Sequence, residues 1–447
     1  MPTTRLSLIA IAIVLAGYAL LDKGFAYIGY PPFFIGEAVL GFMVLCAIAG
    51  AFSFRVFKSP IMWVLLVFVL WQVIRTIPFV QSAGIDSVRD SAMYYYALFA
   101  ILFGAALLKG RSLRWMTICF GKWIPWFLVL SLPLFFISQL YLKSIPTLPG
   151  SNTPFIWLKP GDMAVHLAGI AAFLALGLHR HFPKRDAWRL AVMEFGLWMM
   201  LTIDLVAAGS RNRGGFLAVI VACLAVTVMK PMNRLTRLVV PLLFVVVVAG
   251  ALDVSIPVGG HRDVSIQQIG DNIYSIFFKS NRSELAGTSE WRKEWWEIII
   301  NETFYGDYFW GGRGYGAHLA EEHDFADWTG NRSPHNAHLT FLSRSGVPGL
   351  ILWIVLQGVI IGWLLYWYFR TRNSGAETLA NLNLWVMAYL LAFLVNSSFD
   401  VYLEGPQGGI WYWCVVGFGI ALTEEQRVLM AHRQPQPVAG QHVYVQG

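Results

Sequence analysis

Residues 6–21, "LSLIAIAIVLAGYALL", form an uninterrupted apolar run that directly follows Arg5. An α-helix needs about 20 mostly apolar residues to cross the hydrocarbon core of a bilayer. The run lacks the short apolar core and the cleavage site of a signal peptide, so we predict a retained first span. Comparable runs recur along the chain, centred on 7–22, 33–52, 61–80, 92–108, 123–142, 162–179, 190–208, 215–229, 237–252, 346–369, 382–398 and 408–423. The sequence therefore predicts an all-α polytopic membrane protein with about 12 transmembrane helices.

The composition supports this class. Of the 447 residues, 57% are hydrophobic and 13% are charged, and the mean hydropathy is +0.57. A soluble globular domain carries roughly 25% charged residues, about twice as many. The four cysteines all fall within apolar runs, which favours packing roles over a disulfide framework or a thiolate metal site. The cysteines therefore predict neither a disulfide nor a thiolate metal site, and no motif of the sequence indicates a cofactor.

The only long polar segment of the sequence lies between the ninth and tenth predicted spans. This division gives spans one to nine in 1–252, a partly helical loop in 253–337 and spans ten to twelve in 338–423. The tail 424–447 is polar and contains prolines, so we predict that it is disordered.

Lysine and arginine are distributed unequally between alternate loops. With the N-terminus inside, eighteen fall in the inner segments and seven in the short outer loops. Cytoplasmic loops retain positive charge, so we predict that both termini are cytoplasmic and that the 253–337 loop is periplasmic. The basic residues are scattered rather than gathered in one stripe, which argues against nucleic-acid binding.

Arg211 and Arg213 lie in a very short outer turn, "GSRNRGG". Guanidinium groups pair naturally with phosphate oxygens, and glycines allow a backbone to approach a ligand closely. The turn therefore indicates anion binding, although Asp204, about two turns earlier, offers the alternative of an internal ion pair.

The long loop contains a tryptophan-rich segment at 289–301. Its spacing predicts an amphipathic helix, capped by Thr288 or Ser289, with one apolar face formed by Trp291, Trp295, Ile298 and Ile299. Arg292 and Trp296 lie four residues apart and could meet on the helix surface. Such a helix can lie along the membrane interface and present Arg292 to a lipid headgroup. The alternative is a packed helix in which Arg292 pairs with Glu297 or another carboxylate.

Two further motifs of the long loop give only weak evidence for a binding site. "GGRGYG" at 311–316 lacks the preceding strand and the lysine-serine ending of a nucleotide loop. "HLAEEHDFADW" at 318–328 could bind a metal, but it lacks a catalytic zinc spacing, which favours a solvated acidic face.

Two histidines precede the tenth span, in "NRSPHNAHLTFLSRSGVPGL" at 331–350. A helix starting there would place His335 and His338 on one face. A neutral imidazole can accept a hydroxyl proton near pH 7, so this outer-face histidine pair, beside two arginine clusters, suggests a general base.

Taken in order, "GSRNRGGFLA" (209–218), "EWRKEWWEIIINETFYGDYFWGGRGYG" (290–316) and "HNAHLTFLSRSGVPGL" (335–350) resemble the bacterial O-antigen ligase and O-antigen polymerase superfamily. The resemblance also covers about twelve spans and the long periplasmic loop between the ninth and tenth.

The resemblance implies roles for individual residues. Arg213 matches the family's arginine before small residues better than Arg211 does, and Arg292 with Trp296 matches its loop arginine and tryptophan. His335 and Asn336 match its histidine-asparagine pair, which precedes a Gly-x-x-Gly turn at Gly346 and Gly349. The residues expected to be catalytic are His335, Arg213 and Arg292. Those expected to bind substrate are Arg211, Trp296, Asn336, Arg344 and His338, which is also a competing base. Arg344 stands where relatives often carry an acidic residue, which could alter acceptor preference.

The activity implied by the resemblance is an inverting, metal-independent glycosyl transfer at the periplasmic face of the inner membrane. Its donor is a glycan on undecaprenyl diphosphate. Its acceptor is a lipid A-core sugar for a ligase or another lipid-linked glycan for a polymerase, with protein glycosylation as a weaker option. A transporter or flippase for lipid-linked glycans is the alternative of another class, but charges near the span centres are few and no inverted repeat is visible.

Overall fold

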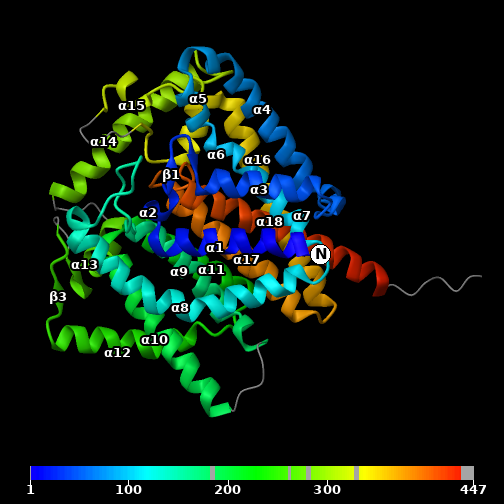
Figure 1. The fold of residues 1–447 in the computed structure, drawn as a ribbon. Helices are drawn as coiled ribbons and strands as arrows, with labels where there is room; N and C mark the ends of the chain where they lie inside the picture. The colour runs from blue at the N-terminus through cyan, green and yellow to red at the C-terminus, as the bar shows by residue number, and fades with distance from the viewer. Residues whose placement is uncertain (1, 182–186, 260–262, 278–282, 327–331, 434–447) are drawn as a thin grey trace, which may run out of the picture.

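The structure is a computed structural model that describes residues 2–181, 187–259, 263–277, 283–326 and 332–433, and helices dominate it (Figure 1). Two short antiparallel hairpins accompany them, β1 (Gly29–Tyr30) with β2 (Phe33–Phe34) and β3 (Ser255–Ile256) with β4 (Val264–Ser265). The α-helices are α1 (Pro2–Leu21), α2 (Lys23–Ala26), α3 (Ile35–Ile48), α4 (Pro60–Ala83), α5 (Ile85–Asp90), α6 (Ala92–Tyr95), α7 (Ala97–Leu107), α8 (Ser112–Tyr141), α9 (Pro160–Ala175), α10 (Ala187–Arg211), α11 (Arg213–Met229), α12 (Thr236–Ala251), α13 (Ile266–Phe277), α14 (Ser283–Ile300), α15 (Leu319–Glu322), α16 (Ala337–Asn373), α17 (Glu377–Ser397) and α18 (Pro406–Arg433).

The predicted all-α class is confirmed. Six of the described helices are long and apolar enough to cross a membrane, and a seventh span results if the pair Ile85–Tyr95 and Ala97–Leu107, bent by 40°, crosses as one. The helices α3, α9, α11 and α12 are apolar but shorter. Each of the twelve predicted runs falls on a helix, whereas the number that cross the bilayer stays a prediction.

Two central helices, α9 and α17, organise the packing. Every residue of α9 from Gly161 to Ala175 is buried, and α9 packs against α10, α11 and α17. Small residues make this possible, since a Cβ on Gly169 would lie 2.7 Å from the ring of Tyr389 on α17. By contrast, α12 packs mainly on α10 and leaves most of its apolar side chains exposed, as a helix facing lipid would.

The ends of the helices define two ends of the molecule. In Figure 1 the N-terminus and the red end of α18 lie on the right, while α13 and α14 lie on the left. The helices α13 and α14, which belong to the predicted 253–337 loop, therefore lie at the end opposite the N-terminus. This arrangement agrees with the charge distribution, and the assignment of this end to the periplasm remains a prediction.

Two predicted boundaries are wrong. The loop helix begins at Ser283, so Thr288 and Ser289 lie inside α14 and do not cap it. The tail is helical as far as Arg433, because α18 continues past Glu424, which is buried and pairs with Arg427 one turn later. Residues 434–447 lie outside the described part of the chain.

A break divides α16 at Gly346, whose φ is 73° and ψ is −176°. The loop 309–314 occupies the break: Phe309 O accepts a hydrogen bond from Val347 N at 2.8 Å, and Arg313 N donates to Ser343 O at 2.7 Å. A Cβ on Gly346 would lie 2.6 Å from Phe309 O, so glycine is required both for the backbone angle and for the space. The Gly-x-x-Gly turn predicted from sequence is therefore a docking point for the glycine-rich loop.

Candidate active site

The segment 398–405, between α17 and α18, carries the central carboxylate of the site. Lys159 Nζ donates to both oxygens of Asp400, at 3.0 and 3.2 Å. Lys159 precedes α9, and its backbone N donates to the Asp22 carboxylate after α1 at 2.9 Å. Residues far apart in the sequence are thus joined at one end of the helix bundle.

His335 lies beside this pair. Its Nδ1 is 3.7 Å from Asp400 Oδ1, and its ring stands perpendicular to that of Trp291, with centroids 6.0 Å apart. The residue has a φ of 54°, a left-handed conformation in which side chains other than glycine are uncommon. Trp296 Nε1 donates to Pro334 O at 2.8 Å and so holds the preceding turn against α14. We infer that α14 positions this histidine.

The predicted shared helical face of His335 and His338 is wrong, because α16 begins only after Asn336. The Asn336 side chain caps the helix by accepting from His338 N and Leu339 N, at 3.0 and 3.2 Å. His335 therefore precedes the helix and points elsewhere. The cap satisfies backbone donors at the helix start, which is a structural use of the asparagine predicted to bind substrate.

His338 is held by contacts on both ring nitrogens. Trp353 Nε1 donates to Nδ1 at 2.9 Å, which leaves Nε2 as the protonated nitrogen. Nε2 lies 3.2 Å from Leu394 O and 3.1 Å from Ser398 Oγ, both of which can accept. This geometry favours His335 over His338 as a proton acceptor.

Two arginines approach the same segment. Arg292 Nη1 donates to Phe399 O at 3.1 Å, rather than pairing with Glu297, and its guanidinium lies over the Trp291 ring instead of meeting Trp296. Burial lowers the pKa of the Arg292 guanidinium; Asp400 counteracts this effect and the nearby charge of Arg213 adds to it. Arg213, the first residue of α11, thus lies close enough to act on Arg292.

Arg211 lines a cavity together with Lys159. It donates to Gly259 O at 3.0 Å and to Gln139 Oε1 at 3.4 Å. A cavity of about 490 Å³ opens here, lined by Arg211, Lys159, Lys143 and the adjoining ends of α8 and α9. The alternative partner Asp204 bonds to Ser131 of α8 at 2.9 Å instead. Three cationic side chains therefore share one recess.

The glycines beside Arg213 have a packing role. Asn212 caps α11 by accepting from Gly215 N at 2.7 Å. A Cβ on Gly215 would lie 2.8 Å from Ala164 Cβ and 2.9 Å from Gly161 Cα, so this glycine brings α11 against α9. The close approach that the sequence suggested for a ligand is made instead to a neighbouring helix, and it places Arg213 beside the start of α9.

The side chain of Arg344 is buried. It is 2% exposed, forms an ion pair with Asp90 at 2.9 Å and donates to Ala317 O at 3.3 Å. Its guanidinium also lies over Tyr315. These contacts join α16 to the glycine-rich loop, so the geometry favours a structural role for a residue predicted to bind substrate.

The acidic loop motif is organised around Glu302. Arg313 pairs with it at 2.6 Å, and His323 Nε2 lies 3.0 Å away. His323 Nδ1 accepts from Trp295 Nε1 at 2.8 Å, which ties the motif to α14.

Trp295 and Ile299 form the buried face of α14, whereas Ile298 is exposed, so one of the four predicted apolar positions is wrong. In the described ranges no three His, Cys, Asp or Glu side chains gather in a metal-binding group.

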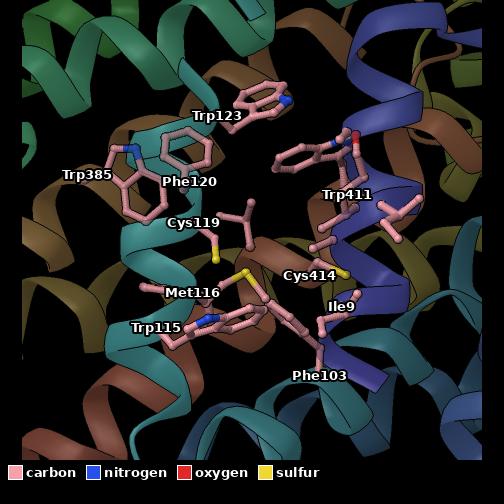
Figure 2. A pocket seen from close by; sticks show the side chains of 16 residues that line it. Ile9, Phe103, Trp115, Met116, Cys119, Phe120, Trp123, Trp385, Trp411 and Cys414 are labelled. Carbon is pink, nitrogen blue, oxygen red and sulfur yellow. Dashed lines mark hydrogen bonds between the residues drawn. The ribbon is translucent and has the colours of Figure 1, made fainter. Parts of the chain in front are cut away.

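A separate apolar pocket of about 340 Å³ lies between α1, α7, α8, α17 and α18. Figure 2 shows Trp115, Cys119 and Trp123 on one side, with Ile9, Trp411 and Cys414 across the opening. The sixteen residues that line it carry no charge, so it can accept hydrocarbon but not a diphosphate.

Lys159, Asp400 and Asp22 were absent from the residues predicted from sequence. Burial raises the pKa of Asp22 to about 6. Burial acts in the same direction on Asp400, but Lys159 and His335 outweigh it and hold the pKa of that carboxyl below its ordinary range. Lys159 could have been identified as a candidate because it is one of the few cations in a short outer loop. Asp400 has no motif around it in the sequence, because its partners come from distant segments.

Residues 195–354 match the sequence model of a family described as O-antigen ligase. No curated protein matches the chain. The matched range contains Arg211, Arg213, Arg292, His335 and Arg344, whereas Lys159 and Asp400 lie outside it. The match confirms the resemblance noted in the sequence, and with the apolar helices it supports glycan transfer of this general type at a bacterial membrane.

Proposed function

We propose that the chain transfers a glycan from undecaprenyl diphosphate to a hydroxyl acceptor at the periplasmic face of the inner membrane, and the match of residues 195–354 to the O-antigen ligase family supports this proposal. The observation that carries the proposal is the convergence of His335, Asp400 and the cations Lys159, Arg213 and Arg292 at one end of the bundle. The family match alone does not select these residues, because Lys159 and Asp400 lie outside the matched range.

The cations account for binding and departure of the diphosphate. Arginine donates in a planar fork that matches phosphate oxygens, and positive charge stabilises the negative charge that develops on a leaving diphosphate. Arg213 and Arg292 lie close enough to act on one another, and Arg211 and Lys143 line a cavity together with Lys159. We assign the reacting diphosphate to Arg213 and Arg292, with Arg211 as a binding residue. These charges make transfer independent of a metal ion.

His335 supplies the base. With Nδ1 directed toward Asp400, Nε2 is the nitrogen that takes the proton from the acceptor hydroxyl. The hydroxyl oxygen forms the new bond to the anomeric carbon as the bond from that carbon to the diphosphate oxygen breaks. Undecaprenyl diphosphate leaves, and attack from the face opposite the leaving group inverts the anomeric configuration. Trp296 and Asn336 hold the turn that carries the base.

The test is donor turnover in proteoliposomes, with the undecaprenyl-diphosphate glycan offered either lipid A-core or a second lipid-linked glycan, in the presence of EDTA. We expect His335→Ala to lower the transfer rate by about 10²–10⁴-fold, the usual contribution of a general base. His432→Ala, in the exposed last turns of α18, is the matched control.

Three results would contradict parts of the proposal. Transfer by His335→Ala near the wild-type rate would remove the base assignment. Loss of wild-type transfer in EDTA, restored by a divalent ion, would refute metal independence. Absence of glycan product on either acceptor, with the donor intact, would count against the transferase itself.

A further inference from the structure

A second cluster of charges lies at the other end of α10, away from the candidate active site. Glu194 is 2% exposed, and its carboxylate meets four basic side chains. His179 Nε2 lies 2.7 Å from Oε1, and Arg180 Nη2 donates to Oε2 at 2.8 Å. Arg234 lies 3.6 Å from Oε1, and Arg237 pairs with Oε2.

The carboxylate of Glu194 has too few oxygens to accept all the hydrogen bonds that its basic partners can donate. A guanidinium group has five N–H donors, whereas a carboxylate offers two oxygens. Among the described residues, Glu194 is the carboxylate that Arg180, Arg234 and Arg237 contact, so three positive charges share one negative charge. Burial lowers the pKa of the Arg234 guanidinium, and the charge of Arg180 lowers it further. The cluster therefore favours an additional anion.

The residues around the cluster indicate that this anion is the headgroup of a lipid. The side chains of Arg180, Arg234 and Arg237 are 33%, 29% and 44% exposed, so an external group can reach them. Arg237 lies in the first turn of α12, whose following side chains Val239 and Val240 are 50% and 63% exposed.

The helix α10 continues the apolar surface beside the cluster. Its Val192 is 62% exposed, and Trp188 near its start is 65% exposed, a residue type enriched at membrane interfaces. Figure 1 shows α12 at the edge of the molecule, where its long side faces outward. A phosphate at the arginines would thus be continuous with a surface that accepts acyl chains.

We propose that Arg180, Arg234 and Arg237 form a binding site for the phosphate of an anionic phospholipid at the inner surface of the membrane. The phosphate oxygens take the guanidinium donors that Glu194 leaves unused, while the acyl chains lie along the exposed faces of α10 and α12. Glu194 holds the three arginines together and limits the affinity, because its charge competes with the lipid phosphate. The site does not depend on the proposed transfer reaction.

The experiment measures retention of phosphatidylglycerol by the full chain in native mass spectrometry and in detergent titration, against phosphatidylcholine and inorganic phosphate. A basic residue near the anionic surface contributes about 1 kcal/mol, so Arg234→Ala with Arg237→Ala is expected to weaken phosphatidylglycerol binding roughly thirtyfold. Arg111→Ala with Arg114→Ala, which removes two exposed arginines at the start of α8, is the charge-matched control and is expected to stay within about threefold.

A second variant separates binding from folding. Glu194→Gln keeps the size of the side chain and removes its charge, so we expect tighter binding of phosphatidylglycerol. A purely structural cluster predicts the opposite: Glu194→Gln would lower stability without raising lipid affinity, and that result would overturn the proposal. Equal retention of phosphatidylcholine would overturn it too, as would binding of inorganic phosphate with no preference for the lipid.

Discussion

Asp400→Asn tests the electrostatic organisation of the site most directly. The substitution preserves shape but removes the charge that faces Lys159 at 3.0 Å and His335 at 3.7 Å. Breaking a buried ion pair by removing one partner costs about 3–5 kcal/mol. The two side chains are 21% and 13% exposed, so partial solvation places the expected loss of unfolding free energy near the lower value, about 3 kcal/mol.

The same substitution removes the group that orients the proposed base. We expect the rate of glycan transfer per folded molecule to fall by about 10²-fold or more. Adding Lys159→Met removes the uncompensated cation, so the double variant is expected to recover part of the lost stability. It is not expected to recover activity, because the carboxylate beside His335 is still absent.

The assay combines denaturant unfolding of each variant with single-turnover transfer from the lipid-linked donor. Asp307→Asn, an exposed carboxyl between α14 and α15, is the control. The reasoning is refuted if Asp400→Asn transfers glycan within about threefold of wild type, or if the two single substitutions add without coupling in stability.

Three further outcomes follow from the structure. Gly346→Ala is expected to lower the thermal midpoint by several degrees, because strain at a positive φ costs about 1–3 kcal/mol and the new Cβ approaches Phe309 O; Gly358→Ala, in open space on the same helix, should not. Burial raises the pKa of Glu404 to about 7, so the folded protein retains a proton that the unfolded chain loses near pH 4.5. Stability is therefore expected to fall as the pH rises from about 5 to 8, and Glu404→Gln should flatten that slope in a thermal series. Trp296→Phe removes the hydrogen bond to Pro334 O, and a selective loss of transfer rate at nearly unchanged stability would identify a positioning role.

The helix content could be predicted from residue types alone. Each apolar run became a helix because a backbone removed from water must satisfy its own hydrogen bonds, and length with hydropathy is sufficient to locate such segments. Boundaries were less predictable. The tail beyond Glu424 looks polar in sequence, but the helix continues to Arg433, and Glu425 in it pairs with Arg55 from a distant segment.

Those residues of the candidate site that lie in a recognisable local motif could be predicted from the sequence. Arg213, Arg292 and His335 occupy recognisable motifs, and folding brings them to one end of the bundle. Arg344 shows the limit of this reasoning, because its enclosure by Asp90 and the glycine-rich loop depends on α16 breaking at Gly346.

The sequence by itself therefore determined the helical class of this chain, and it predicted that the basic and histidine motifs lie at one face of a membrane. The tertiary structure alone decided which of them meet. His335 and His338 are three residues apart, yet one faces Asp400 and the other is enclosed by Trp353 and the end of α17. Lys159 and Asp400 are 241 positions apart and in contact. Local propensity acts over a few residues, whereas a buried charge is stable only where packing supplies its partner.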